Sequence, residues 1–175
     1  MVAFFASMRA DLEVTVHDAD SLASYIHGSA EVIGLLCVQV FLAEETVSAA
    51  DRATMDRGAR YLGSAFQKIN FLRDLGEDSS ILGRAYFPQA AGGVLSEAAK
   101  SALIAEIRRE LAAAEEAINL LPLSARVGVR AAADIFAELT NRLAATPATA
   151  LATTRVSVPN HTKAWLAARA VRRRR

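Results

Sequence analysis

The sequence has one cysteine, few aromatic residues and few residues that break helices. Cys37 stands alone in 175 residues, so no disulfide can form within the chain, which fits a reducing compartment such as the cytoplasm. Aromatic residues make up 6% of the chain, and there are only 9 glycines and 4 prolines. Hydrophobic residues make up 53% and are mostly Ala and Leu, which favours closely packed helices. We therefore expect one all-α domain over residues 1–175, with Cys37 packed in its core.

Other absences narrow the classes of function. The net charge is +1, so the overall field predicts no particular partner, and no nucleic acid is expected. The longest apolar run, VIGLLCVQVFLA, is interrupted by Gln39 and is shorter than a bilayer-spanning helix. No signal peptide is recognisable, so we expect a cytoplasmic protein. No HExxH zinc motif and no Ser-His-Asp arrangement is visible.

Helical periodicity runs through most of the sequence, and strand-like alternation is short throughout. Ser21, Ser48 and Ser96 each precede an apolar-periodic segment and are predicted N-caps. Pro122 and Pro147 mark the ends of two segments, and the RVSVP stretch is expected to be extended. The predicted helices cover residues 4–15, 22–43, 49–78, 96–121 and 125–145, and a last one begins near Asn160.

The predicted helix 49–78 carries an unusual polar face. Gln67, Asn70, Asp74 and Asp78 fall within about 80° of one another on a helical wheel, and the opposite side is apolar. Amide and carboxylate oxygens one turn apart suit Mg²⁺, which binds one or two carboxylates together with substrate phosphates. The spacing alone leaves two interpretations open, a metal–diphosphate site and a solvated acidic helix end.

The complete stretch QKINFLRDLGEDSSILGRAYFP, residues 67–88, resembles the second aspartate-rich region of the squalene/phytoene synthase family. Three other segments support the resemblance: MRADLE from Met8, YIHGSAEVIGLLC from Tyr25, and RVSVPNHTKAWLAARA from Arg155. The family pattern is close to Q-x-x-N-x-x-R-D-x-x-E-D followed by G-R-x-Y-x-P. The matching residues are Gln67, Asn70, Arg73, Asp74, Glu77, Asp78, Gly83, Arg84, Tyr86 and Pro88.

The resemblance implies an all-α isoprenoid synthase fold and a transferase activity. Members join two prenyl diphosphates, such as geranylgeranyl or farnesyl diphosphate, head to head in carotenoid and isoprenoid biosynthesis. The resemblance implies Mg²⁺ as cofactor, with Mn²⁺ as an alternative. It assigns Asn70, Asp74 and Asp78 as metal ligands, and Asp74 and Asp78 as the catalytic carboxylates.

The same resemblance assigns residues to the substrate. The substrate-binding residues that it implies are Tyr25, Gln67, Arg73, Arg84 and Tyr86. The residues expected to line the prenyl cavity are Ser29, Ile33, Leu36 and Val40. His27 stands where many members have tyrosine and is expected in the cavity wall or the core.

One part of the family pattern is not found in the sequence. The family has a first aspartate-rich motif, and the early residues Asp11, Glu13, Asp18 and Asp20 do not match its context. We therefore expect an N-terminally incomplete form, truncated or split, with a separate chain as the source of the missing helices. The alternative is a non-enzymatic member that acts as an assembly or interaction protein.

The C-terminus is strongly basic. The last seven residues, RAVRRRR, contain five arginines. A solvated tail is one interpretation, and peripheral contact with anionic lipid on the inner face of a membrane is the other.

Overall fold

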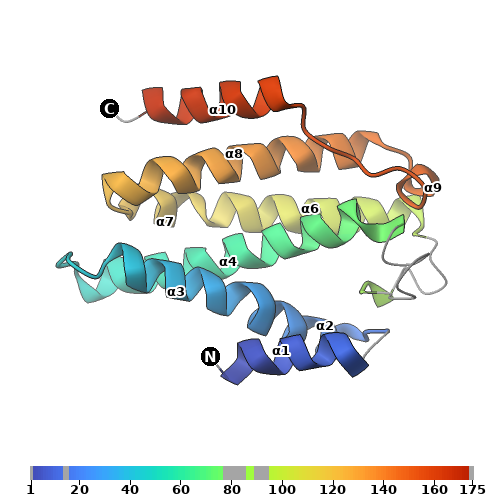
Figure 1. The fold of residues 1–175 in the computed structure, drawn as a ribbon, viewed down its shortest axis with the longest axis horizontal. Coiled ribbons are helices and arrows are strands. Elements are labelled where there is room, and N and C mark those ends of the chain that lie inside the picture. The colour runs from blue at the N-terminus through green and yellow to red at the C-terminus, as the bar shows by residue number, and fades with distance from the viewer. Residues whose placement is uncertain (1, 14–15, 77–85, 89–94, 174–175) are drawn as a thin grey trace.

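The computed structural model describes residues 2–13, 16–76, 86–88 and 95–173. The regular elements within these ranges are helices, in agreement with the predicted all-α class. The long helices lie side by side, from α10 on one side of the molecule through α8, α6 and α4 to α3 and α1 on the other (Figure 1). Their bounds are α1 Val2–Glu13, α2 Ala19–Ile26, η1 His27–Glu31, α3 Val32–Phe41, α4 Ala49–Arg73, α6 Glu97–Ala113, α7 Glu115–Leu120, α8 Leu123–Ala145, α9 Ala148–Leu151 and α10 Asn160–Arg172.

Serine side chains cap two of the long helices as the sequence predicted. The hydroxyl oxygen of Ser48 accepts a hydrogen bond from the first turn of α4, and that of Ser96 does the same for α6. The prediction for Ser21 was wrong. Asp18 is the N-cap of α2, and Ser21 completes a capping box by accepting a bond of 2.9 Å from the Asp18 backbone N–H.

The predicted helix 22–43 contains a π-helical turn, η1, between α2 and α3. At this turn the carbonyl oxygen of Tyr25 accepts hydrogen bonds from the hydroxyls of Ser29 (2.7 Å) and Ser7 (3.1 Å). Gly28 lets α1 cross the turn closely, because a Cβ there would lie 2.3 Å from the carbonyl oxygen of Ala3. Helix α1 is therefore fixed against the turn by a close backbone approach and a hydroxyl.

Helix α4 ends earlier than predicted. It runs to Arg73, and Asp74 is its C-cap, with φ −97° and ψ 8°. Residues 75 and 76 are helical again, so the helix that the periodicity predicted to residue 78 is interrupted by a bend at Asp74. Glu77, Asp78, Gly83 and Arg84 lie outside the described residues. The face that carries Gln67 and Asn70 is therefore helical, and Asp74 lies at the helix end.

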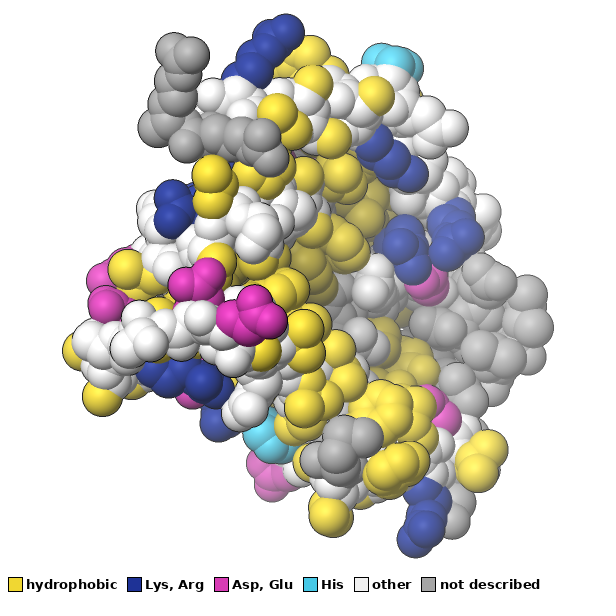
Figure 2. Space-filling model, turned by 60° about the vertical axis from the view of Figure 1, so that its left-hand side comes forward, with side chains coloured by type: hydrophobic (Ala, Val, Ile, Leu, Met, Phe, Trp, Pro, Cys, Tyr) yellow, Lys and Arg dark blue, Asp and Glu magenta, His cyan; other side chains and the backbone are white. Residues whose placement is uncertain are grey.

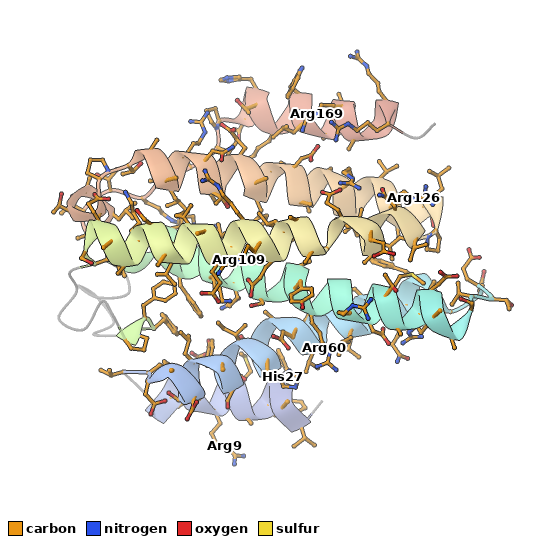
Figure 3. All side chains as sticks on the ribbon, turned by 180° about the vertical axis from the view of Figure 1, so that it is seen from behind. Arg9, His27, Arg60, Arg109, Arg126 and Arg169 are labelled. Carbon is orange, nitrogen blue, oxygen red and sulfur yellow. The ribbon has the colours of Figure 1, made fainter. Side chains whose placement is uncertain are left out.

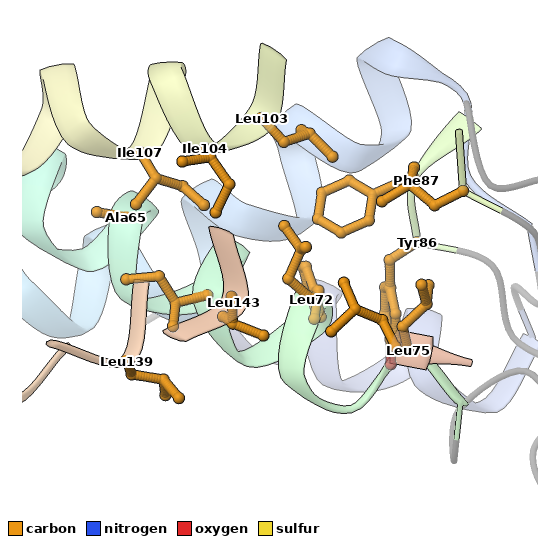
Figure 4. Close-up of a cluster of buried hydrophobic side chains, with 14 of the residues drawn as sticks. Ala65, Leu72, Leu75, Tyr86, Phe87, Leu103, Ile104, Ile107, Leu139 and Leu143 are labelled. Atoms are coloured by element: carbon orange, nitrogen blue, oxygen red, sulfur yellow. The ribbon is translucent and has the colours of Figure 1, made fainter. Parts of the chain in front are cut away.

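The core lies between α4, α6 and α8 (Figure 4). Ile69 and Leu72 of α4, Ile107 of α6 and Leu143 of α8 are fully buried. Phe87, which lies between Tyr86 and Pro88 of the family motif, closes one end of this cluster at 1% exposure. The apolar face of α4 packs in this core. Its polar face and its small residues therefore face a different part of the molecule.

One helical stretch within the described ranges, residues 19–41, is long and apolar enough to cross a membrane by length and composition alone. A core helix of a soluble protein and a signal sequence near the N-terminus pass the same test, so this is weak evidence.

Candidate functional site

An apolar groove of about 340 Å³ lies between α3, α4, α7 and α8. Figure 2 shows it as a hollowed band of hydrophobic side chains across the centre of one face. One end of its lining is polar, with Ser29 and Gln67, and the other end is formed by Phe41, Met55 and Leu121. Its walls also include Ile33, Cys37, Phe66, Ile118 and Val129.

Glycines set the closeness of the helices that form the groove. A Cβ on Gly34 of α3 would lie 2.6 Å from the carbonyl oxygen of Ala59, and a Cβ on Gly63 of α4 would lie 2.7 Å from that of Ala30. Such contacts exclude a side chain without movement of the backbone. The groove therefore has a wall in which the backbones of α3 and α4 touch.

The predicted diphosphate-binding face continues from the polar end of the groove. Gln67 lines the groove, and Asn70 and Asp74 follow at intervals of three and four residues on α4. The segment from Gln67 to Asp74 spans about 10 Å at 1.5 Å per helical residue. The apolar groove and the candidate metal ligands therefore lie one after the other along α4. This order matches a prenyl diphosphate, which has a long apolar chain with a charged diphosphate at one end.

Two arginines hold the carboxylate of Asp74. Arg73 donates from Nε to Oδ1 (2.9 Å) and from a terminal nitrogen to Oδ2 (2.5 Å), and Arg155 donates from Nε to Oδ1 (2.8 Å). Burial of Asp74 opposes its charged form, but the two guanidinium groups outweigh that effect and lower the pKa of the carboxyl below its ordinary value. Asp74 is thus a carboxylate at neutral pH, with positive charge on two sides.

Arg155 was missed as a site residue by sequence reasoning. It lies in the segment before α10, 81 residues after Asp74, and its side chain is 62% exposed. A concave region of about 470 Å³ includes Arg73, Asp74 and Arg155. The only signal in the sequence was that Arg155 begins the RVSVP stretch, which resembles the C-terminal end of family members.

The two predicted substrate-binding tyrosines lie together in the core. Tyr86 stacks on Phe71 of α4 with ring centroids 3.9 Å apart, and Tyr25 donates its hydroxyl to Oδ1 of Asp11 at 2.9 Å. Burial raises the pKa of the Tyr25 hydroxyl. His17, to which the sequence assigned no role, is 4% exposed and stacks on Tyr86. This aromatic cluster packs beside the helix end that carries Asn70 and Asp74.

The four predicted cavity residues divide into two pairs. Ser29 and Ile33 line the groove, whereas Leu36 and Val40 do not and are 39% and 72% exposed. The lining side of α3 is centred near Cys37 and Phe41, so Leu36 and Val40 are rotated by roughly 100° from it.

Two further expectations for this region were wrong. Cys37 is exposed in the groove rather than buried in the core. The His27 side chain is 43% exposed, lies 2.9 Å from the carboxylate of Glu31 and does not line the groove.

The donor set fits a hard divalent cation in its chemistry. Asn70 and Asp74 supply amide and carboxylate oxygens, the ligands that Mg²⁺ prefers. Asp78, the third predicted ligand, lies outside the described residues. Within the part of the chain that the structure describes, no group of three or more His, Cys, Asp or Glu side chains is placed to hold a metal ion. The metal role of these residues remains a prediction.

Comparison with known proteins identifies the family. The family model for squalene/phytoene synthase matches residues 1–162. The chain belongs to the squalene/phytoene synthase family. A bifunctional lycopene cyclase/phytoene synthase of Phycomyces blakesleeanus is 32% identical over 140 residues, covering 69% of this chain and 23% of that protein. One of Blakeslea trispora is 28% identical over 139 residues, covering 70% of this chain and 22% of that protein.

The chain thus spans less than a quarter of the length of these curated relatives. Its all-α architecture agrees with the isoprenoid synthase fold of the squalene/phytoene synthase family.

Proposed function

We propose that this chain forms the prenyl-binding groove and one metal-binding wall of a phytoene synthase-type prenyltransferase, which joins two prenyl diphosphates head to head. The observation that carries the proposal is the continuity along α4, where the apolar groove ends at Gln67 and the same helix continues to Asn70 and Asp74. A geranylgeranyl or farnesyl chain would lie in the groove, with its diphosphate beside Asn70 and Asp74.

The residues at the polar end suit the departure of a diphosphate. Asn70, Asp74 and Asp78 would hold Mg²⁺ or Mn²⁺, which supplies charge stabilisation for the leaving diphosphate when bound. Arg73 and Arg155 present guanidinium groups at the same place, and guanidinium groups bind phosphate oxygens in pairs. The apolar walls keep water from the allylic carbocation that ionisation creates.

The single cysteine allows a direct test of groove occupancy. Cys37 is exposed and lines the groove, so a bound prenyl chain should protect its thiol from alkylation by iodoacetamide. We expect geranylgeranyl diphosphate with Mg²⁺ to slow the reaction about tenfold or more at saturation, while inorganic diphosphate with Mg²⁺ should have no effect. Equal alkylation rates with and without the prenyl compound would contradict the location of the groove.

A pair of substitutions on α3 supplies a matched control. Leu36→Phe adds an aromatic ring outside the groove, whereas Cys37→Phe adds one inside it. Binding of a fluorescent prenyl diphosphate should be lost in Cys37→Phe and retained in Leu36→Phe. If both variants bind equally well, the groove is not the prenyl site.

Turnover separates the enzyme from the alternative function. Mg²⁺-dependent formation of a coupled product, abolished by Asp74→Ala, would support the transferase. A non-enzymatic role in assembly is favoured by the exposed apolar side chains on α1 and just after it, since Val2, Phe5, Leu12 and Val16 are between 59% and 88% exposed. Prenyl binding without turnover, together with stable association with a second protein, would support that alternative.

A further inference from the structure

A second cavity, of about 420 Å³, lies at the end of the bundle where α7, the start of α8 and the end of α10 meet. Three arginines line it: Arg126 and Arg130 from α8 and Arg173 after α10. Glu115 is its only acidic lining residue within the described part of the chain. The side chains that line it therefore carry a net charge of +2, as three arginines less one carboxylate.

Two of the arginines, Arg126 and Arg130, are held in place by the bundle. Arg130 is 12% exposed, pairs with the Glu115 carboxylate and donates to the Asn119 amide oxygen at 2.9 Å. Arg126 donates from Nε to the carbonyl oxygen of Leu121 at 2.9 Å, which leaves its two terminal nitrogens for another acceptor. Fixed guanidinium groups lose little entropy when they bind an anion.

The helix end adds to the positive potential. Leu123, the first residue of α8, lines the cavity, and the first turn of α8 contains no acidic side chain. The N-terminus of a helix carries a partial positive charge and unpaired N–H groups, which favour an anion. Figure 3 places Arg126 at this end of the molecule and Arg109 near its middle.

This cavity adjoins the far end of the apolar groove. Leu121 connects the two, because its side chain lines the groove and its carbonyl oxygen binds Arg126. Exposed apolar residues lie at the same end, with Leu120 at 36%, Leu123 at 47% and Val171 at 48% exposure. Positive charge beside exposed apolar side chains is the pattern of a surface that contacts phospholipid headgroups.

We propose that the cavity lined by Arg126, Arg130 and Arg173 is a phosphate-binding pocket that takes the headgroup phosphate of an anionic phospholipid. The pocket is distinct from the Asn70–Asp74 region, and its occupancy does not require a prenyl chain in the groove. The two proposals can therefore fail separately. An empty phosphate pocket would not affect the proposed prenyltransferase function, and loss of that function would not affect the pocket.

The test compares two double variants of the full chain with equal loss of charge. Arg126→Gln with Arg173→Gln alters the pocket, and Arg108→Gln with Arg109→Gln alters two exposed arginines of α6. Each protein is sedimented with vesicles of phosphatidylcholine alone and with 30% phosphatidylglycerol. A lipid-proximal arginine contributes about fivefold in partitioning, so the pocket variant should bind anionic vesicles roughly 30-fold more weakly than the control.

A second arm identifies the source of the phosphate. Thermal unfolding is followed in inorganic phosphate, inorganic diphosphate and chloride at equal ionic strength. If binding to anionic vesicles weakens in the pocket variant and not in the control variant, the lipid headgroup is supported as the source of the phosphate. Saturable stabilisation by the free anions, lost in the pocket variant while vesicle binding is unchanged, supports free phosphate instead. If the pocket and control variants behave alike in both arms, the proposal is overturned.

Folding of the variants is controlled separately. Arg126 contacts the backbone of Leu121, so its loss can weaken the bundle. Arg173→Glu keeps Arg126 and changes a side chain that is 55% exposed and lies 3.9 Å from its nearest carboxylate partner. This variant should fold normally and still lose binding to the anionic vesicles. Retained binding in a folded Arg173→Glu protein would also overturn the proposal.

Discussion

Replacing Gly63 by alanine tests whether the contact between α4 and the π-helical turn is as close as the structure indicates. A Cβ at this position would lie 2.7 Å from the Ala30 carbonyl oxygen, 3.0 Å from its carbon and 3.2 Å from the Glu31 Cα. All three neighbours are backbone atoms, so a side-chain rotation cannot relieve the overlap. The two helices must move apart, and the groove that they line must change shape.

Gly128→Ala is the matched control, because Gly128 also lies within a long helix and a Cβ there would meet nothing within 4 Å. Both substitutions gain about 1 kcal/mol in helix propensity, so their difference isolates the overlap. Overpacking typically costs about 1–3 kcal/mol. We expect the free energy of unfolding of Gly63→Ala to be about 2 kcal/mol lower than that of Gly128→Ala.

The assay is thermal and urea unfolding followed by circular dichroism. A difference of about 2 kcal/mol corresponds to roughly 4–8 °C in Tm for a chain of this size. Gly128→Ala should melt above the parent protein, since its gain in propensity is not opposed. A Gly63→Ala protein that melts at or above Gly128→Ala would refute the close approach of α4 to the turn.

A half-buried carboxylate, Asp74, and a buried ammonium, Lys68, give the remaining predictions. The pKa of Asp74 is depressed, so its ion pairs stabilise the fold above the unfolded pKa near 4 and this stability is lost as pH falls through the folded pKa. Asp74→Asn should therefore lower the free energy of unfolding by about 1 kcal/mol at pH 7 and by little at pH 3. Equal losses in urea unfolding at both pH values would contradict the ion pairs. Lys68 donates to Glu106 (2.5 Å) and Glu110 (2.6 Å), so Lys68→Met should lower the free energy of unfolding by about 3–5 kcal/mol at pH 8. The buried Glu110 carboxylate would lose its cationic partner and keep the hydrogen bond from the Ser64 hydroxyl. Burial raises the pKa of Glu110, so protonation should restore part of that stability at pH 5, and a cost independent of pH would exclude this cause.

The sequence predicted the parts of the fold that depend on local chemistry. Ser48 and Ser96 begin α4 and α6 as expected, because a serine hydroxyl satisfies a free N–H of the first turn wherever the helix packs. The order of Gln67, Asn70 and Asp74 along α4 also follows from helical periodicity. Their roles in metal and substrate binding stay predictions.

Contacts between distant segments were not predictable in the same way. The pairing of Arg155 with Asp74 joins residues 81 positions apart, and no periodic signal marks such a pair. The four-residue helix α9 is too short to produce a recognisable pattern. Asp18 took the N-cap position expected of Ser21 because both residues suit a cap, and only the backbone geometry decides between them.

The cavity residues show how a local irregularity defeats periodicity. A π-helical turn holds one residue more than an α-helical turn, so every side chain after it is displaced by one position from an extrapolated wheel. Ser29, Ile33, Leu36 and Val40, which the resemblance implied, share one face of a regular helix, but the turn at His27–Glu31 shifts α3 out of that register. This displacement accounts for the position of Cys37 in the groove and for that of Leu36 and Val40 outside it.

The same turn makes the length of this segment a variable in its own right. Loss of one codon within residues 27–31 would restore a regular helix, because four α-helical residues rotate the chain about as far as the five residues of this turn. The side chains of α3 would then keep their places in the groove, and the change would be confined to the turn. A one-residue deletion within α3 itself would instead rotate every later side chain of that helix by about 100°, so the groove tolerates a change of length at the turn and not beyond it.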